Sequence, residues 1–373
     1  MAADQCDIAI VGSGIVGLAH ALEARRRGLS AVVVERDHRC VGASIRNFGF
    51  VTVSGQGAGA AWERARRARD TWAEVAPRAG IAIEHRGLWL LARRPEARAV
   101  LEAFLRTPMG EGCQVVDAAE AARRAPWLRT EGAAGALWSP HELRVESRDA
   151  IPRLTSWLES ERGVRVLRGE CALGIEPGAV RTTRGIVRAS RVILCPGADL
   201  TGIAEPWLRG HPIRQCRLQM LRVRPRGGPV LGSAVMSDLS LVRYRGYAAL
   251  PEAAALRRRL ESEEAESLSH GIHLIAVRSA DGSLVVGDSH HYDATPEPFA
   301  REDVDQLILR HLGEALSGGP FGVTERWTGV YPSLDSADAL LLKPEPWLRV
   351  AVVTSGTGAS TAFGIAEETL ADA

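Results

Sequence analysis

Residues 6–37 read CDIAIVGSGIVGLAHALEARRRGLSAVVVERD, and this stretch decides the fold. The apolar run 7–11 predicts a buried strand, and the residues after the glycines carry the apolar spacing of a helix. A second apolar run, 31–34, predicts another strand and ends in Glu35. Strand, glycine turn, helix, strand and acid in this order indicate a dinucleotide-binding βαβ unit.

Each glycine of the G-x-G-x-x-G pattern has a mechanical reason. Gly12 allows a tight turn, Gly14 lets the backbone approach a pyrophosphate, and Gly17 permits close contact between helix and sheet. The helix N-terminus offers free N–H groups and a partial positive charge to the phosphates. Glu35 suits ribose hydroxyls and argues against the extra phosphate of NADP. We expect Ile15, Val16 and Arg36 beside the same nucleotide.

Two later segments favour FAD over NAD. A predicted strand, 191–194, leads into Cys195-Pro196-Gly197-Ala198, and a predicted strand, 350–353, leads into a glycine turn and a helix from about Ser360. A second helix N-terminus aimed inward suits the pyrimidine edge of a flavin, where negative charge gathers on reduction. No second complete G-x-G-x-x-G follows a strand, so we expect electrons to enter from an organic substrate.

Composition limits the partners. The chain has 373 residues, 46% of them hydrophobic, and a formal charge of +1, so neither nucleic acid nor a membrane is expected. The six cysteines are scattered without a C-x-x-C pair, and residues 1–7 lack the features of a signal peptide. We expect a cytoplasmic protein of about two domains, and its oligomeric state stays open.

The chain resembles the D-amino-acid oxidase, glycine oxidase and sarcosine oxidase family of FAD-dependent amine oxidases nearly end to end. Gly42-Ala43-Ser44 matches the loop with which that family wraps the flavin. Further segments resemble a bacterial subgroup associated with oxidation of 2-aminoethylphosphonate or its N-alkyl derivatives. These segments are Arg46-Asn47-Phe48-Gly49, Leu218-Gln219-Met220-Leu221, Gly287-Asp288-Ser289-His290 and the run from Arg326-Trp327 to Gly329-Val330-Tyr331.

The resemblance implies an α/β fold with two parts. A Rossmann-like FAD domain of the two-dinucleotide type would take residues 1–84, 145–206 and 324–373. An α+β substrate domain with a large mixed or antiparallel sheet would take 85–144 and 207–323. The residues themselves predict a strand over 87–94, a helix over 150–163 and a hairpin turning at Asp281-Gly282.

The resemblance also implies the reaction and the residues near the flavin. A hydride would pass from the amine-bearing carbon to flavin N5, the imine would hydrolyse to an aldehyde and ammonia or an amine, and O₂ would be reduced to H₂O₂. The predicted cofactor-binding residues are Gly12, Gly14, Ile15, Val16, Gly17, Glu35, Arg36, Ala43, Ser44, Asn47, Phe48, Gly49, Val166, Pro196, Gly197, Trp327, Gly329, Gly356, Thr357, Gly358, Ala359, Ser360 and Thr361.

An anionic head group favours guanidinium donors, which contact oxyanions in pairs. The predicted substrate ligands are Arg46, Asn47, Arg243, His290, Arg326 and Tyr331. Of these, His290, Arg326 and Tyr331 are also catalytic candidates, with His290 as the possible proton acceptor. A structural ion pair is an equal alternative for Arg46, and packing against the flavin is one for Tyr331.

No metal is expected. His290 and His291 are adjacent and point to opposite faces of a strand, and no cluster of metal-ligand spacing accompanies them. Neither a cysteine after Cys216 nor a histidine in 44–49 offers a covalent flavin link, so we expect dissociable FAD.

Other functions stay open at this stage. The chain is alternatively a glycine, sarcosine or D-amino-acid oxidase that uses Arg326 for a carboxylate. It is alternatively a flavin dehydrogenase of a specialised pathway, or a non-enzymatic flavin-binding subunit.

Overall fold

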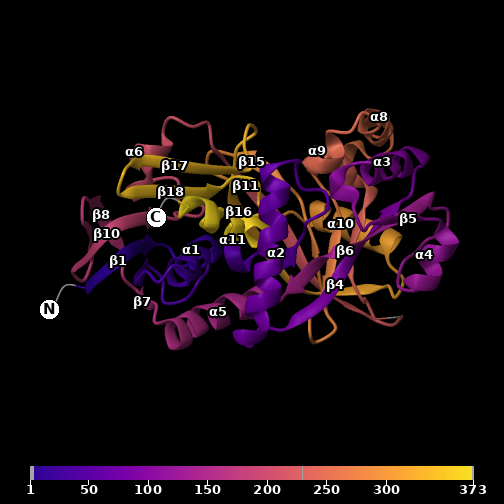
Figure 1. Ribbon diagram of the computed structural model, residues 1–373. Coiled ribbons are helices and arrows are strands. Elements are labelled where there is room, and N and C mark those ends of the chain that lie inside the picture. The colour runs from indigo at the N-terminus through magenta and orange to yellow at the C-terminus, as the bar shows by residue number, and fades with distance from the viewer. Residues whose placement is uncertain (1–3, 229, 372–373) are drawn as a thin grey trace.

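The computed structural model describes residues 4–228 and 230–371 and contains two sheets that lie side by side (Figure 1). The strands of the first sheet are β1 (Asp4–Val11), β2 (Ala31–Glu35), β7 (Arg165–Arg168), β8 (Ala172–Glu176), β9 (Ala179–Thr182), β10 (Ile186–Leu194), β17 (Ala339–Glu345) and β18 (Leu348–Val353). Their main path runs β17-β18-β10-β1-β2-β7. The ladders from β18 to β7 are parallel, so these strands end at one edge of the sheet.

Helices cover the first sheet because its central strands are apolar throughout. They include α1 (Ile15–Arg26), α2 (Ala60–Arg78), α5 (Ser147–Arg162) and α11 (Gly358–Thr369). Their core joins the N- and C-terminal helices, and Trp72 of α2 meets Phe363 of α11 edge to face at 5.3 Å between ring centroids. The two ends of the chain therefore belong to one structural unit.

The second sheet follows the order β15-β11-β14-β13-β12-β4-β6-β3, with β16 on β11 and β5 on β6. Its strands are β3 (Phe50–Val51), β4 (Ile83–Ala92), β5 (Gln114–Val116), β6 (Gly135–Val145), β11 (Arg214–Pro225), β12 (Ala234–Ser237), β13 (Ile275–Arg278), β14 (Leu284–Gly287), β15 (His291–Asp293) and β16 (Phe321–Ser333). The remaining helices are α3 (Pro95–Leu105), α4 (Ala118–Arg124), α6 (Glu205–Leu208), α7 (Arg245–Ala248), α8 (Ala253–Glu263), α9 (Ala265–Ser269) and α10 (Glu302–Ala315).

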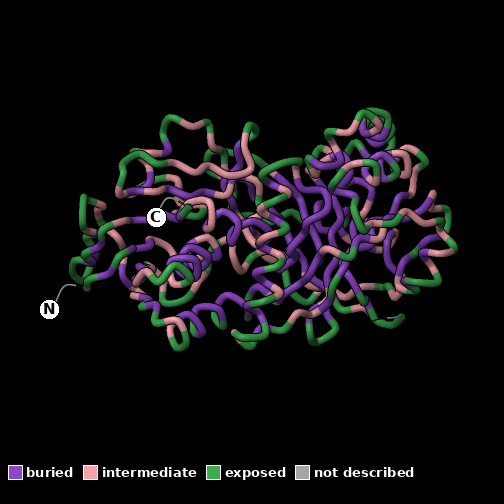
Figure 2. The backbone as a smooth tube through the Cα atoms, viewed as in Figure 1, coloured by how far each residue is buried: buried purple, intermediate pink, exposed green. Residues whose placement is uncertain are grey.

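Alternation along the strands gives the second sheet two different faces. On β4, Leu88 and Leu90 join a core with α3 and α8, whereas Trp89 and Leu91 join a core with α10. Both faces are covered, and the strands of this sheet are the largest buried region in Figure 2. The face toward α3 also carries Tyr331 of β16, so the cavity described below opens on that side.

The two-sheet α/β fold is confirmed. The predicted strands and helices are present, with bounds that differ by a few residues, and β13 and β14 form the expected antiparallel hairpin around Asp281-Gly282. The division into domain ranges stays a prediction. One feature crosses it: β16 pairs with β11 in the second sheet, although most of β16 lies after residue 324.

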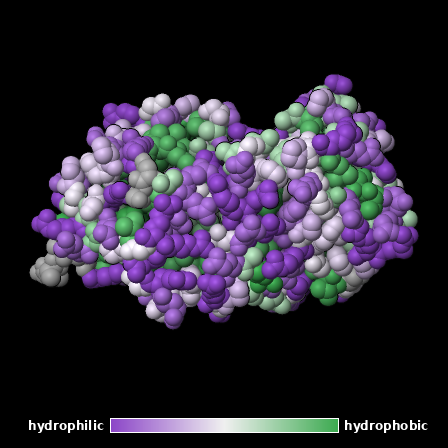
Figure 3. Space-filling view, in the orientation of Figure 1, coloured by the Kyte–Doolittle hydropathy of each residue, from purple (hydrophilic) through white to green (hydrophobic). Residues whose placement is uncertain are grey.

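The surface gives little sign of a large apolar patch on the face drawn in Figure 3, where hydrophilic residues predominate and hydrophobic ones form separate groups. Within residues 4–228 and 230–371, no helix combines the length and hydropathy that crossing a bilayer requires.

Gly49 fixes the path from the first sheet to the second. Its φ is 67°, and a Cβ there would lie 1.7 Å from the carbonyl oxygen of Val145. Two hydrogen bonds hold the Gly49 backbone in this conformation. Its N–H donates to Asn47 Oδ1 at 2.7 Å, and its carbonyl accepts from Val145 N at 2.9 Å. Only glycine fits this backbone without displacing β6.

We expect Gly49→Ala to lower the thermal midpoint by about 5 °C or more, because it adds both a left-handed strain and a backbone clash. Gly42→Ala is the matched control, since nothing lies within 4 Å of a Cβ at Gly42 in the same loop. Differential scanning calorimetry measures both. Equal midpoints for the two variants would contradict the assignment.

Candidate active site

A cofactor groove lies where the carboxyl ends of the parallel strands meet. It is bounded by the first glycine turn, the loop after β2, the turn after β10 and the start of α11. Its lining includes Ile15, Val16, Ala43, Ser44, Arg46, Asn47, Gly197, Gly329, Gly356, Gly358 and Ala359. Segments from both chain ends thus form one groove, as a dinucleotide spanning the edge of the sheet requires.

The glycines of the first turn are tightly enclosed. A Cβ on Gly12, whose φ is 103°, would lie 2.4 Å from the Cys195 carbonyl oxygen. A Cβ on Gly17 would lie 1.9 Å from the Gly12 carbonyl oxygen. Gly14 caps α1 and leaves only 3.0 Å between such a Cβ and Ser44 Oγ. The turn therefore excludes side chains at Gly12 and Gly17, and a side chain at Gly14 would crowd Ser44.

Hydrogen bonds and an ion pair fix the loops at the carboxyl ends of β1, β2 and β10. Glu35 Oε2 accepts from Ser13 N at 2.8 Å and Ser13 Oγ at 2.7 Å, and Oε1 accepts from Asp37 N at 2.9 Å. Ser44 Oγ accepts from Ile15 N at 2.9 Å. Arg36 pairs with Asp199 at 2.7 Å across to the turn after β10.

The flavin-loop residues divide into lining and support. Asn47 lines both the cofactor groove and a second, inner cavity that adjoins it. Its side-chain amide is already hydrogen-bonded, to Ala43 O at 2.8 Å and Ser147 Oγ at 2.7 Å. Phe48 is 8% exposed and lines the inner cavity. Arg46 is exposed and lines the cofactor groove only.

The other predicted cofactor residues take varied positions. Val166 is buried in β7 opposite Val33, and Trp327 Nε1 donates to the Arg46 carbonyl at 3.1 Å while Arg148 stacks on its ring at 4.6 Å. Neither is among the residues that line the groove. Pro196 and Thr361 also lie outside that set, whereas Thr357 and Ser360 line the inner cavity.

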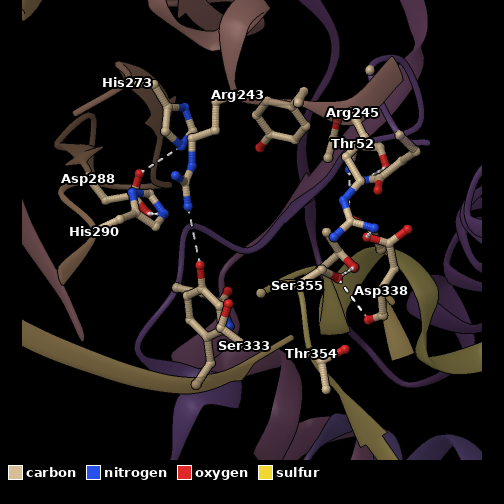
Figure 4. A pocket seen from close by; sticks show the side chains of 18 of the residues that line it. Thr52, Arg243, Arg245, His273, Asp288, His290, Ser333, Asp338, Thr354 and Ser355 are labelled. Atoms are coloured by element: carbon tan, nitrogen blue, oxygen red, sulfur yellow. Dashed lines mark hydrogen bonds and ion pairs between the residues drawn. The ribbon is translucent and has the colours of Figure 1, made fainter. Parts of the chain in front are cut away.

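The inner cavity of about 240 Å³ adjoins the groove and shares Asn47, Leu218, Tyr331, Gly356 and Ala359 with it. In Figure 4, Arg243, His273, Asp288 and His290 gather on one side of the cavity, while Arg245, Asp338 and Ser355 lie on the other. Arg245 is neutralised there, since Nη1 lies 3.3 Å from Asp338 Oδ1. A molecule in this cavity would touch the start of α11 and the second sheet together.

Arg243 is the cation that remains available in the inner cavity. Its Nη2 donates to Tyr292 Oη at 2.9 Å and to Tyr331 Oη at 3.5 Å. Among the described residues no carboxylate lies within 4.0 Å of its guanidinium. Burial raises the pKa of Tyr331 well above its ordinary value, so the phenol stays protonated and keeps an O–H to donate.

Asp288 lies between two imidazoles. Its Oδ1 is 3.2 Å from His273 Nε2 and its Oδ2 is 3.6 Å from His290 Nε2. Burial raises the pKa of Asp288 to about 7, although the nearby Arg243 guanidinium opposes this. Burial lowers the pKa values of His273 and His290 well below the usual range, so both rings are neutral.

The structure corrects the expectation that no cluster accompanies the histidine pair. Candidate ligand atoms of His273, Asp288 and His290 all lie within 4.8 Å of one another. His290 and His291 do point to opposite sides: His290 faces the cavity, while His291 Nε2 lies 3.0 Å from His270 Nδ1. The sequence places His273 fifteen residues before Asp288, and the β13–β14 hairpin closes that distance.

Arg326 does not lie at the cavity. It is opposite Leu221 on the face of the sheet that packs against α10, whereas Tyr331 is opposite Cys216 on the other face. Its Nε donates to the buried Asp305 at 2.7 Å, and Nη2 pairs with Glu302 at 3.5 Å. An odd spacing of five residues along one strand places the two side chains on opposite faces.

Several cavity residues were not predicted, among them His273, Asp288 and Tyr292. Asp288 lies inside the quoted run Gly287-Asp288-Ser289-His290, so its proximity to His290 was a usable signal. Tyr292 joins the site only because β15 pairs with β11 next to Tyr331, and pairing between distant strands left no mark in the local sequence.

The sequence matches a known family of flavoproteins. The family model described as "FAD dependent oxidoreductase" (DAO) matches residues 7–372, and the chain belongs to this family. It is therefore an FAD-dependent oxidoreductase, and the predicted cofactor is confirmed. No curated protein sequence matches the chain.

Solved structures with the same fold cover nearly the whole chain. Glycine oxidase from Geobacillus kaustophilus is 20% identical with a TM-score of 0.77, over 99% of this chain and 94% of that one. L-proline dehydrogenase from P. horikoshii is 17% identical with a TM-score of 0.79, over 99% and 93%. L-α-glycerophosphate oxidase from Mycoplasma pneumoniae, solved with FAD bound, is 15% identical with a TM-score of 0.75, over 98% and 94%.

We expect the FAD to be released when the protein is denatured, because no cysteine lines either the groove or the inner cavity among the described residues. Precipitation with acid should leave the flavin absorbance in the supernatant. Yellow colour retained in the washed pellet would show a covalent bond instead.

Proposed function

We propose that the protein is an oxidase of a small amine with an anionic head group, with 2-aminoethylphosphonate or an N-alkyl derivative as the substrate. The products would be an aldehyde, ammonia or an amine, and H₂O₂ from O₂. The observation that carries the proposal is Arg243, a cation in the inner cavity whose described partners are two phenols and no carboxylate.

An oxyanion completes this arrangement of donors. Arg243 donates to the oxygens of Tyr292 and Tyr331, and both phenols also contact the Cys216 thiol. A thiol is a weak hydrogen-bond partner, so an oxyanion in the cavity would replace it as the acceptor of the phenol hydrogens. Guanidinium and phenol donors together suit the several oxygens of a phosphonate. The segments shared with the aminophosphonate-associated subgroup, which include Tyr331 and His290, support the phosphonate over a carboxylate.

The chain's own groups also supply a route for the amine proton. When bound, FAD accepts the hydride from the substrate carbon. The amine has to be uncharged at that step, and the Asp288–His290 pair is the proton acceptor we propose. Burial makes His290 alone a weak base, whereas the Asp288 carboxyl has a pKa of about 7 and holds the proton. Phe48, Leu218 and Ile275 line the cavity and help to exclude water.

A carboxylate-bearing amine is the second candidate substrate, since one guanidinium with two phenols also matches a carboxylate. The glycine oxidase fold neighbour favours it. A dehydrogenase that passes electrons to a carrier is the third candidate. The free cysteines are consistent with a cytoplasmic location, which we keep as part of the proposal.

The test is anaerobic stopped-flow reduction of the flavin. We expect 2-aminoethylphosphonate to bleach the flavin absorbance, with glycine, sarcosine and D-alanine at least about 100-fold less effective in rate per concentration. Bleaching by a carboxylate alone would overturn the phosphonate assignment. In air, one H₂O₂ per aldehyde identifies an oxidase, and little H₂O₂ identifies a dehydrogenase.

We expect Arg243→Met to lower kcat/KM by roughly 10²–10³, because the head group loses the cavity cation that has no carboxylate partner among the described residues, while the phenols remain. Arg326→Met is the contrasting variant. It should lower the thermal midpoint, since Asp305 is 2% exposed and would lose its cation, but change kcat/KM little. A larger kinetic loss in Arg326→Met than in Arg243→Met would contradict this placement.

A further inference from the structure

The fold alone leaves open whether the oxidised carbon bears nitrogen or oxygen. Structures with this fold include glycine oxidase and L-α-glycerophosphate oxidase, whose names specify an amine and an alcohol. A site that separates the two must sense the group on the reacting carbon, apart from the anionic head. The residues around Asp288 have that ability.

The tautomer of His290 is fixed by its neighbour. His290 Nδ1 lies 2.9 Å from the carbonyl oxygen of Gly271, which can only accept a hydrogen bond. Nδ1 therefore carries the hydrogen, and Nε2 of the neutral ring presents a lone pair. That lone pair faces Asp288 Oδ2 across 3.6 Å.

Asp288 offers a second acceptor at the same place. Its side chain is 6% exposed; Oδ1 lies 3.2 Å from His273 Nε2 without forming a hydrogen bond, and Oδ2 is the oxygen that lies near His290. His273 stacks on His290 at 5.2 Å between ring centroids, and its Nδ1 is held 3.2 Å from Ser240 Oγ. Tyr244 closes the outer side by an edge contact with His273 at 5.5 Å.

When Asp288 is ionised, its Oδ2 and His290 Nε2 are two acceptors close together in a buried wall, and they require a donor. Asp288 and His290 both line the inner cavity, so the substrate can supply that donor. Arg243 lines the same cavity but pairs with the tyrosines instead. The Arg243 guanidinium and the acceptors on Asp288 and His290 thus lie at separate places in one cavity. They match a zwitterion whose anionic group binds at Arg243 and whose ammonium group binds at Asp288 and His290.

We infer that Asp288 and His290 form a subsite for the ammonium group of the substrate, and that this subsite selects an amine over an alcohol with the same head group. The inference rests on the proposed function and deepens it. An ammonium group has at least two N–H donors and reaches both acceptors. A hydroxyl has one donor and leaves one buried acceptor unpaired, which is costly.

The experiment compares ligands that differ only at the sensed group. Binding to the FAD-loaded, dithionite-reduced enzyme is measured by anaerobic calorimetry, where no turnover occurs. The ligands are 2-aminoethylphosphonate, 2-hydroxyethylphosphonate and ethylphosphonate, each with wild type, Asp288→Asn and His290→Gln. A parallel set of β-alanine, 3-hydroxypropionate and propionate replaces the phosphonate by a carboxylate.

We expect wild type to bind the amine at least about 30-fold more tightly than the alcohol, and Asp288→Asn to abolish most of that preference. Ethylphosphonate should bind wild type and Asp288→Asn within about 3-fold, which also reports an intact cavity. If Asp288→Asn no longer binds ethylphosphonate, its cavity is disrupted and His290→Gln is the deciding variant. It should lose the preference for the amine while it still binds ethylphosphonate.

The outcomes separate the two proposals. If ethylphosphonate binds but the amine preference is absent or survives in both variants, the ammonium subsite is wrong and the anionic-head proposal stands. If only the carboxylate set binds with the amine preference, the subsite stands and the phosphonate assignment falls. If wild type binds no ligand of either set, both are overturned. A stoichiometric divalent metal, released by a chelator with loss of the site, would also overturn the subsite.

Discussion

The parallel alignment of β1, β10 and β18 is the constraint on which the rest of the structure depends. Parallel neighbours end on the same edge, so the turns that follow Val11, Leu194 and Val353 meet although they are far apart in the chain. The backbone N–H of Cys195 donates to Val11 O at 2.9 Å, which extends the ladder to the turn itself. The cofactor groove is the consequence of this shared edge.

The second sheet acquires its role through contacts with that edge. Gly49 directs the flavin loop into β3, and β16 carries Tyr331 to the start of α11. Because side chains alternate along β16, Tyr331 and Gly329 line the cofactor groove while Arg326 pairs with Asp305 of α10. The same strand thus provides a cavity residue, Tyr331, on one face of the sheet and a structural ion pair, at Arg326, on the other.

The sequence predicted the first sheet well because its signals are local. Gly12, Gly14, Gly17 and Glu35 lie within one βαβ unit, and their spacing alone determines their geometry. The substrate side was predicted less completely because it depends on pairing between distant strands. The prediction for Arg326 was wrong because the local sequence does not show which face of β16 packs against α10. His273 and Tyr292 reach the cavity only through β13 and β15. Asp288 lies two residues before His290, and its place at the cavity depends on burial beside His273, which the local sequence does not show.

The contact between Gly356 and Tyr331 has a consequence for how this enzyme can change. A Cβ at Gly356 would lie 2.9 Å from the Tyr331 ring, so the turn before α11 and the Tyr331 ring are in direct contact where the cofactor groove meets the inner cavity. Reshaping the pocket at Tyr331 with a bulkier group would displace the α11 turn, and a smaller group would leave that turn unsupported. The shape of the inner cavity at Tyr331 and the shape of the groove at Gly356 are therefore coupled, whereas Tyr292 lies on the edge strand β15.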